Sequence, residues 1–232
     1  MIEGRTLFPG RVRSPFAAPQ VLAPGSWQRK IGARVEKGPW KGMPLFTLTL
    51  EERATCPRSC SNYAVCMGNG MPFAQRNRAG LSLEVTIAKE LRLLQERHPN
   101  GFVVRAHILG DFYSPEYVGL WRGWLEAFPA LRVFGYTAWR PGTRIGDAVE
   151  RLALEQWARF AVRLSHPEPG PRRAVTLFTL DPPAPNMITC PVELGRTRDC
   201  ASCGLCWAPA ARDKTIAFIA HGPARGRPKK NG

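Results

Sequence analysis

The seven cysteines of this 232-residue chain fall into two groups whose spacing favours metal binding. The first group is Cys56, Cys60 and Cys66, and the second is Cys190, Cys200, Cys203 and Cys206. An odd number of cysteines leaves one thiol over in any scheme made only of disulfides. Residues 1–13 lack the long apolar core of a signal peptide, so we expect a cytoplasmic, reducing environment. Clustered thiols in such an environment indicate metal binding or catalysis.

The second cysteine group predicts an iron–sulfur cluster. Its C-x2-C-x2-C run ends at Cys206 and matches the bacterial ferredoxin pattern, in which three thiolates bind one [4Fe–4S] cluster. In two-cluster ferredoxins the fourth ligand comes from a separate Cys-Pro, and Cys190-Pro191 supplies such a residue. Structural zinc normally uses two C-x2-C pairs separated by a loop, which this group lacks. We therefore predict a [4Fe–4S] cluster, with zinc as the alternative.

The first cysteine group, C-x3-C-x5-C, provides three thiolates and no obvious fourth ligand. A [4Fe–4S] cluster held by three protein thiolates leaves one iron open, as radical S-adenosylmethionine enzymes require. Their usual spacing is C-x3-C-x2-C in the loop after the first barrel strand, so the loop position and the x3 spacing agree while the x5 spacing does not. S-adenosylmethionine therefore stays an open alternative here. So do His107 or Asp111 as a fourth ligand, and a zinc site completed by a histidine.

Hydrophobic patterns predict an α/β fold. Apolar runs or alternating patterns predict strands at residues 45–50, 102–109, 131–137, 157–164, 174–180 and 215–220, and helical spacing predicts helices at 81–97, 115–128 and 146–156. Near-continuous apolar strands that alternate with helices are typical of a parallel sheet. A full eight-fold barrel usually needs about 250 residues. We therefore expect an incomplete (β/α) barrel or a parallel sheet, similar to the radical S-adenosylmethionine fold.

Polar residues near predicted strand ends are candidate catalytic groups, because ligands of such folds bind at the carboxyl ends of the strands. Arg105 and His107 alternate along strand 102–109, so we expect both side chains to face the barrel interior. Asp111 follows that strand, where a carboxylate could bind a ribose, a cation or an amine. The alternative for Asp111 is a cap on the helix that begins near Ser114.

The excess of positive charge lies mostly at the two ends of the chain. The net charge is +15, and residues 1–43 hold eight Lys and Arg against two acidic residues, while residues 221–232 hold four against none. Both ends are rich in Pro and Gly and lack hydrophobic periodicity. We therefore divide the chain into a basic arm (1–43), an α/β metal-binding domain (44–222) and a basic tail (223–232).

The basic tail is a candidate nucleic-acid interface. Its positive residues are Arg225, Arg227, Lys229 and Lys230. The Arg-Gly-Arg-Pro centre resembles an AT-hook, in which extended arginines enter the narrow minor groove of AT-rich DNA. The alternative is a basic tail that only increases solubility. No apolar run approaches the roughly 18 residues that a membrane helix needs, so we expect no membrane partner.

Several strings over residues 44–222 resemble the bacteriophage gene product 88 family. They are CSNYA (60–64), VRAHILGDF (104–112), Tyr136-Thr137, Cys190-Pro191 and CGLCW (203–207). The resemblance implies a phage or prophage protein whose cysteines bind iron–sulfur clusters. It implies no particular reaction.

Two functions compete. The first is an iron–sulfur protein, either a redox or a radical-type enzyme, that carries one or two [4Fe–4S] clusters and acts on or near DNA or RNA. The second is a non-catalytic nucleic-acid-binding protein with structural zinc, in which Arg-rich ends give affinity by counterion release.

Overall fold

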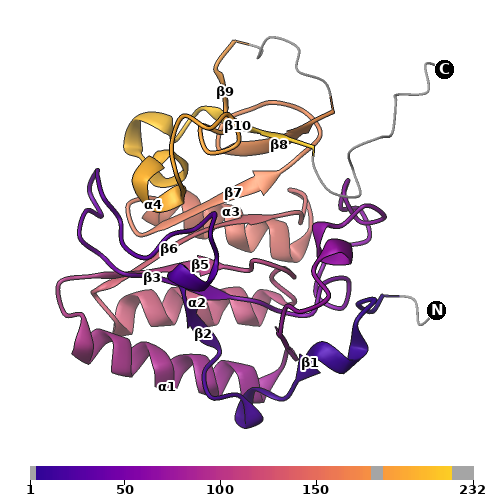
Figure 1. The fold of residues 1–232 in the computed structure, drawn as a ribbon, viewed down its shortest axis with the longest axis vertical. Coiled ribbons are helices and arrows are strands. Elements are labelled where there is room, and N and C mark those ends of the chain that lie inside the picture. Colours follow the sequence, from indigo (N-terminus) through magenta and orange to yellow (C-terminus); the bar gives the residue numbers. More distant parts are fainter. Residues whose placement is uncertain (1–3, 179–184, 221–232) are drawn as a thin grey trace.

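Short apolar and β-branched runs form an eight-stranded sheet in the computed structural model, which describes residues 4–178 and 185–220 (Figure 1). The strand order is β2-β3-β5-β6-β7-β8-β10-β9, and neighbouring strands are parallel except β2 and β3. The strands are β2 (Leu22–Pro24), β3 (Leu45–Leu48), β5 (Phe102–Ala106), β6 (Leu131–Thr137), β7 (Phe160–Ser165), β8 (Arg173–Leu177), β9 (Met187–Thr189) and β10 (Thr215–Ile219). A separate parallel pair consists of β1 (Val12–Arg13) and β4 (Arg76–Asn77).

Three long helices connect strands β3 to β7. They are α1 (Leu81–Arg97), α2 (Pro115–Ala127) and α3 (Arg144–Gln156). Helix α2 begins as the sequence predicts, because the Ser114 hydroxyl accepts a hydrogen bond from Tyr117 N and Pro115 occupies the first turn. No helix in the described part of the chain has both the length and the apolar character needed to cross a membrane.

The predicted α/β class and mostly parallel sheet are confirmed, whereas a closed barrel is not formed. Within the described residues β2 and β9 are the two edges of the sheet. The alternation of strand and long helix also stops at β7: the chain beyond it carries the short helix α4 (Cys200–Cys203) and the 3-10 turns η5 (Leu205–Trp207) and η6 (Pro209–Ala211). The remaining 3-10 turns are η1 (Pro9–Arg11), η2 (Pro15–Ala17), η3 (Gly25–Trp27) and η4 (Met67–Gly70).

The two faces of the sheet have different coverings. Val104 and Ala106 of β5 pack in the core formed with α1, α2 and α3, and Figure 1 shows these helices close together beside the sheet. Val103 and Arg105 alternate with them and point to the other face. That face packs against a second cluster, which contains Ile31, Val35, Trp40, Ala201 and Trp207. The face opposite the three long helices, which carries only the short helix α4 among the described α-helices, therefore holds both the cysteine loops and the polar residues of the strands.

The structure corrects the expected boundary at residue 44. Strand β2 extends the main sheet by pairing antiparallel with β3, and Val21, Leu22 and Trp40 are buried. Residues 4–43 are therefore part of the packed fold rather than a free arm. Sequence patterns miss this because the apolar residues lie at irregular intervals among Pro and Gly, in 3-10 turns without a regular period. The predicted tail (223–232) lies outside the described residues.

Candidate metal centre

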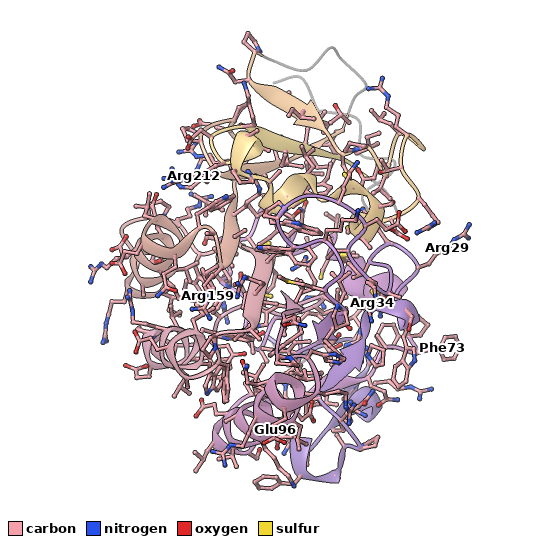
Figure 2. The ribbon with its side chains drawn as sticks, turned by 90° about the vertical axis from the view of Figure 1, so that its left-hand side faces the viewer. Arg29, Arg34, Phe73, Glu96, Arg159 and Arg212 are labelled. Carbon is pink, nitrogen blue, oxygen red and sulfur yellow. The ribbon has the colours of Figure 1, made fainter. Side chains whose placement is uncertain are left out.

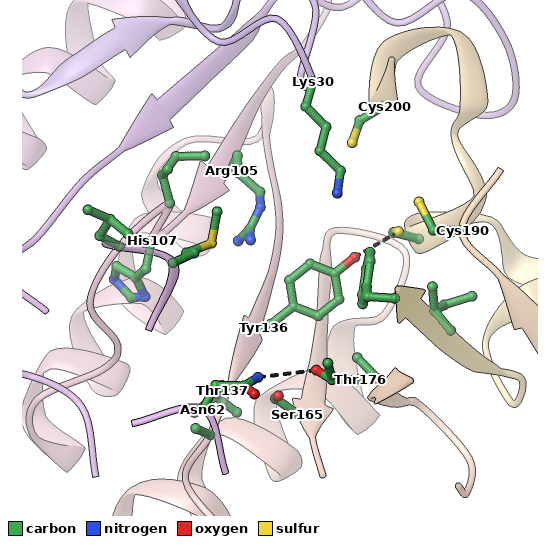
Figure 3. Close-up of a pocket in the computed structure, with 18 of the residues that line it drawn as sticks. Lys30, Asn62, Arg105, His107, Tyr136, Thr137, Ser165, Thr176, Cys190 and Cys200 are labelled. Carbon is green, nitrogen blue, oxygen red and sulfur yellow. Dashed lines mark hydrogen bonds between the residues drawn. The ribbon is translucent and has the colours of Figure 1, made fainter. Parts of the chain in front are cut away.

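All seven cysteines line one cavity of about 350 Å³ on the face opposite the three long helices. Each is a free thiol. The first group lies in the loop between β3 and β4, whereas the second lies between β9 and β10. Figure 3 shows Cys190, Cys200 and Tyr136 around the same space, with Arg105 on its other side. The fold thus gathers thiols that are well over a hundred residues apart in sequence.

The second group surrounds a tight turn. Asp199 caps α4 by accepting a hydrogen bond from Ser202 N at 2.8 Å, and Ser202 Oγ accepts one from Asp199 N at 3.1 Å. Gly204 ends the helix with a φ of 67°, which favours glycine and reverses the chain between Cys203 and Cys206. Burial raises the pKa of Cys206, and the neighbouring Cys203 raises it further. A thiolate that binds a metal therefore needs nearby positive charge or hydrogen-bond donors that offset this rise in pKa.

Compensation comes from donors and cations around the same thiols. Tyr136 donates from its hydroxyl to Cys206 Sγ at 2.8 Å. Burial raises the pKa of both thiols, and this rise is partly offset by Arg163 at Cys206 and by Arg105 and Lys30 at Cys200. A metal ion or cluster adds positive charge and holds such thiols as thiolates. The donor set is therefore suited to thiolate ligation.

Arg163 fixes the backbone of the second group. Its side chain is fully buried and donates to the carbonyl oxygens of Cys206 (3.0 Å), Lys214 (2.9 Å) and Ala211 (2.8 Å). The guanidinium also lies 5.1 Å from the ring centre of Trp157. These contacts tie η5 and η6 to β7.

The N-terminal segment forms another wall of this site. Cys200 N donates to Lys30 O at 2.9 Å, and Ala201 N donates to Ile31 O at 3.0 Å. Trp40 stacks on Trp207 with ring centres 5.1 Å apart. Trp207 is buried and also lines the cavity, so the stacked pair joins the N-terminal segment to the cavity wall.

The first group occupies a loop held by a buried ion pair. Arg76 Nε donates to Glu52 Oε2 at 2.7 Å, and both side chains are at most 1% exposed. Arg76 also donates to Gly68 O at 3.1 Å. Gly68 packs so closely that a Cβ there would lie 2.8 Å from Glu52 Oε1. Burial raises the pKa of Cys56, Cys60 and Cys66.

Asp111 joins this loop to the carboxyl ends of β5 and β6. Its carboxylate accepts hydrogen bonds from Phe112 N (2.8 Å) and Ala138 N (2.7 Å). Gly110 has a φ of +82°, and a Cβ there would lie 2.7 Å from Thr55 Oγ1. Burial raises the pKa of Asp111 to about 7, and its charge raises the pKa of nearby Cys56 after the larger effect of burial. Asp111 is not the helix cap, because Ser114 takes that position.

His107 and Arg105 both line the cavity, but His107 lies beyond the end of strand β5 and not in the alternation that the sequence predicts. Strand β5 ends at Ala106, and His107 has a φ of 57°. Its ring packs edge-on against Phe112, with ring centres 4.6 Å apart, and Nε2 lies 3.3 Å from the Tyr117 hydroxyl. Burial, reinforced by Arg105, lowers the pKa of His107 to about 3. Nδ1 is buried without a hydrogen-bond partner among the described residues, so it is the atom available to a ligand.

Sequence reasoning finds the cysteines but misses their supports. Lys30, Arg76, Glu52 and Arg163 contribute charges or anchors and are not among the predicted site residues. Charged residues inside otherwise apolar runs, such as Arg163 in FAVRL, are a signal that could identify them. Within the described residues, no three His, Cys, Asp or Glu side chains are placed to hold a single metal ion.

No family model, curated protein or solved structure matches this chain or its fold. The function is therefore argued from the site alone. The candidate nucleic-acid residues Arg225, Arg227, Lys229 and Lys230 lie outside the described residues.

Proposed function

We propose that this chain is an iron–sulfur protein with two clusters. Cys190, Cys200, Cys203 and Cys206 would hold a [4Fe–4S] cluster. Cys56, Cys60 and Cys66 would hold a second cluster with one iron open to the cavity. The observation that carries the proposal is that all seven cysteines are free thiols on one cavity.

The arrangement favours clusters over single zinc ions. Four ligands of one zinc ion surround a single point, about 2.3 Å from each sulfur. The four thiolates of a [4Fe–4S] cluster bind four different irons and are spaced more widely. The thiols of each group influence one another's pKa, so they lie close enough to share one cofactor. The C-x2-C-x2-C run with a separate Cys190-Pro191 matches the cluster pattern rather than the two C-x2-C pairs of structural zinc, and this supports cluster ligation.

The surroundings of the first group support an enzyme of redox or radical type. A cluster with an open iron supplies one-electron chemistry to a molecule bound there. The chain's own residues would bind and orient that molecule: Asp111 and Arg105 both line the cavity. S-adenosylmethionine is one candidate ligand for the open iron, and His107 Nδ1 is the competing protein ligand.

The resemblance to the gene product 88 family supports a phage or prophage origin.

The basic tail supports a DNA or RNA partner. Deleting residues 223–232 should weaken DNA binding and reduce the slope of log affinity against log salt by about 0.9 for each phosphate that the tail neutralises. An unchanged slope would remove the tail from the proposal.

The cluster proposal is tested with the full chain purified anaerobically. We expect a brown protein with broad absorption at about 400 nm, and Cys60→Ser or Cys203→Ser should each lose about half of the iron. Ser61→Ala is the control, because Ser61 is exposed. Adding S-adenosylmethionine should change the electron paramagnetic resonance signal of the reduced protein if that ligand binds. Full iron content in both cysteine variants would contradict the assignment.

A further inference from the structure

Arg105 is a cation inside the cavity that forms no ion pair with a carboxylate of the described residues, although its charge partly offsets the raised pKa of Cys200 and Asp111. One N–H group donates to the carbonyl oxygen of Ala106. The other donors are available to the cavity, which Arg105 lines. Figure 3 shows the guanidinium directed toward the space between His107 and Tyr136.

Aromatic rings hold the guanidinium in position. Its carbon lies 4.7 Å from the ring centre of Tyr136 and 5.5 Å from that of Phe134. Contacts of this kind fix the plane of an arginine while leaving its N–H edge open. The group is therefore oriented before any ligand arrives.

The other charges on this cavity have partners of their own. Lys30 forms an ion pair with Glu193 at 2.5 Å, and Glu52 is paired with Arg76. Both carboxylate oxygens of Asp111 accept backbone hydrogen bonds. Arg53 donates through Nη2 to the Asn69 side chain at 2.6 Å, while its Nη1 is buried without a partner among the described residues. Hence Arg105 has donors that the described part of the protein does not satisfy.

We propose that the cavity binds a small organic oxyanion, with its carboxylate or phosphate group on the guanidinium of Arg105. The planar fork of arginine matches both groups with two parallel hydrogen bonds. The cavity volume of about 350 Å³ lies within the usual range for small-molecule sites. The inference deepens the proposed function and rests on it, because it gives the chemical class of the molecule that would meet the open iron.

The test measures anion binding by the anaerobically purified full chain. Acetate and inorganic phosphate are the probes, and the rise of the thermal midpoint with probe concentration gives an apparent affinity. Sodium chloride at equal ionic strength controls for the +15 net charge. The probe with the higher apparent affinity shows whether the site prefers a carboxylate or a phosphate group.

Arg105→Met and Arg29→Met form a matched pair, because each removes one positive charge. Arg29 is exposed and points away from the molecule (Figure 2). We expect at least a tenfold loss of apparent affinity in Arg105→Met, a smaller loss in Arg105→Lys, and wild-type affinity in Arg29→Met. Arg105→Lys keeps the charge and serves if the methionine variant does not fold.

Equal affinity in Arg105→Met and Arg29→Met would overturn the proposal, as would the absence of any effect beyond that of sodium chloride. Iron and sulfide are measured in every preparation. Failure of the cluster proposal would appear as wild-type protein without iron, whatever the anion results. The two ideas can therefore fail separately.

Discussion

At the scale of residues, Cys206 shows how neighbouring groups offset part of the cost of a buried thiolate. Burial raises its pKa, and Arg163 and the Tyr136 hydroxyl oppose that effect. Such contacts around a ligand also tune the metal, because donors to sulfur stabilise the more negative, reduced state. The hydrogen bond from Tyr136 should therefore set part of the reduction potential.

Replacing Tyr136 by Phe should lower the reduction potential of one cluster by tens of millivolts while leaving the iron content unchanged. A redox titration followed by electron paramagnetic resonance measures this. Tyr113→Phe is the control, because the Tyr113 hydroxyl donates to Glu84 at 2.8 Å and does not line the cavity. Equal potentials in the two variants would refute a role for the Tyr136 hydroxyl.

His107 should make stability depend on pH. Its folded pKa of about 3 lies below the usual 6.5. The stability that the neutral ring contributes is therefore fully present above pH 6.5 and is lost as the pH falls toward 3. Lowering the pH from 8 to 5 should reduce the free energy of unfolding by about 2 kcal/mol through His107 alone. Urea unfolding of wild type and His107→Gln at both pH values measures the difference. Parallel pH profiles would show that His107 is not buried as a neutral ring.

At the scale of elements, two buried arginines hold the cysteine loops. Arg163 binds the second loop through backbone carbonyls, and Arg76 holds the first through Glu52. A buried ion pair need not add net stability, yet removing one partner leaves an unpaired charge. The loops should therefore be sensitive to single changes at these arginines.

Arg76→Met should destabilise the fold by about 3–5 kcal/mol, because Glu52 remains buried without its partner. Arg122→Met should cost less than about 1 kcal/mol, because the Arg122–Glu155 pair is exposed. Denaturant unfolding compares the two variants. Adding Glu52→Gln to Arg76→Met should recover part of the stability, and no recovery would point to a cause other than the unpaired charge.

The main-sheet strands and the long helices between residues 45 and 165 follow from local patterns, with boundaries within three residues of those expected. Short strands do not: β2 and β9 have three residues each and exist through pairing with β3 and β10. The cysteine grouping is also visible in the sequence. The position of His107 is not, because a positive φ interrupts the alternation that predicts its direction.

At the scale of the whole molecule, the basic N-terminal segment is part of the packed fold. Residues 30–36 hydrogen-bond to α4, and Arg5 donates to Glu51 at 2.6 Å in the stretch that leads to the first cysteine loop. The N-terminal segment therefore belongs to the candidate metal centre. Its positive charge is in part structural and cannot all be counted toward nucleic-acid affinity.

Removing residues 1–43 should abolish cluster binding, because the deletion takes away β2, Trp40 and Lys30. Removing residues 223–232 should leave the iron content unchanged. Iron analysis of the two truncated chains tests this division. Wild-type iron content in a chain that begins at residue 44 would contradict this division and favour residues 1–43 as a free arm.

Iron and acid-labile sulfide in the anaerobically purified chain test the central claim most directly. Two [4Fe–4S] clusters predict about eight irons and eight sulfides per chain. A colourless protein that holds zinc and no sulfide would contradict it.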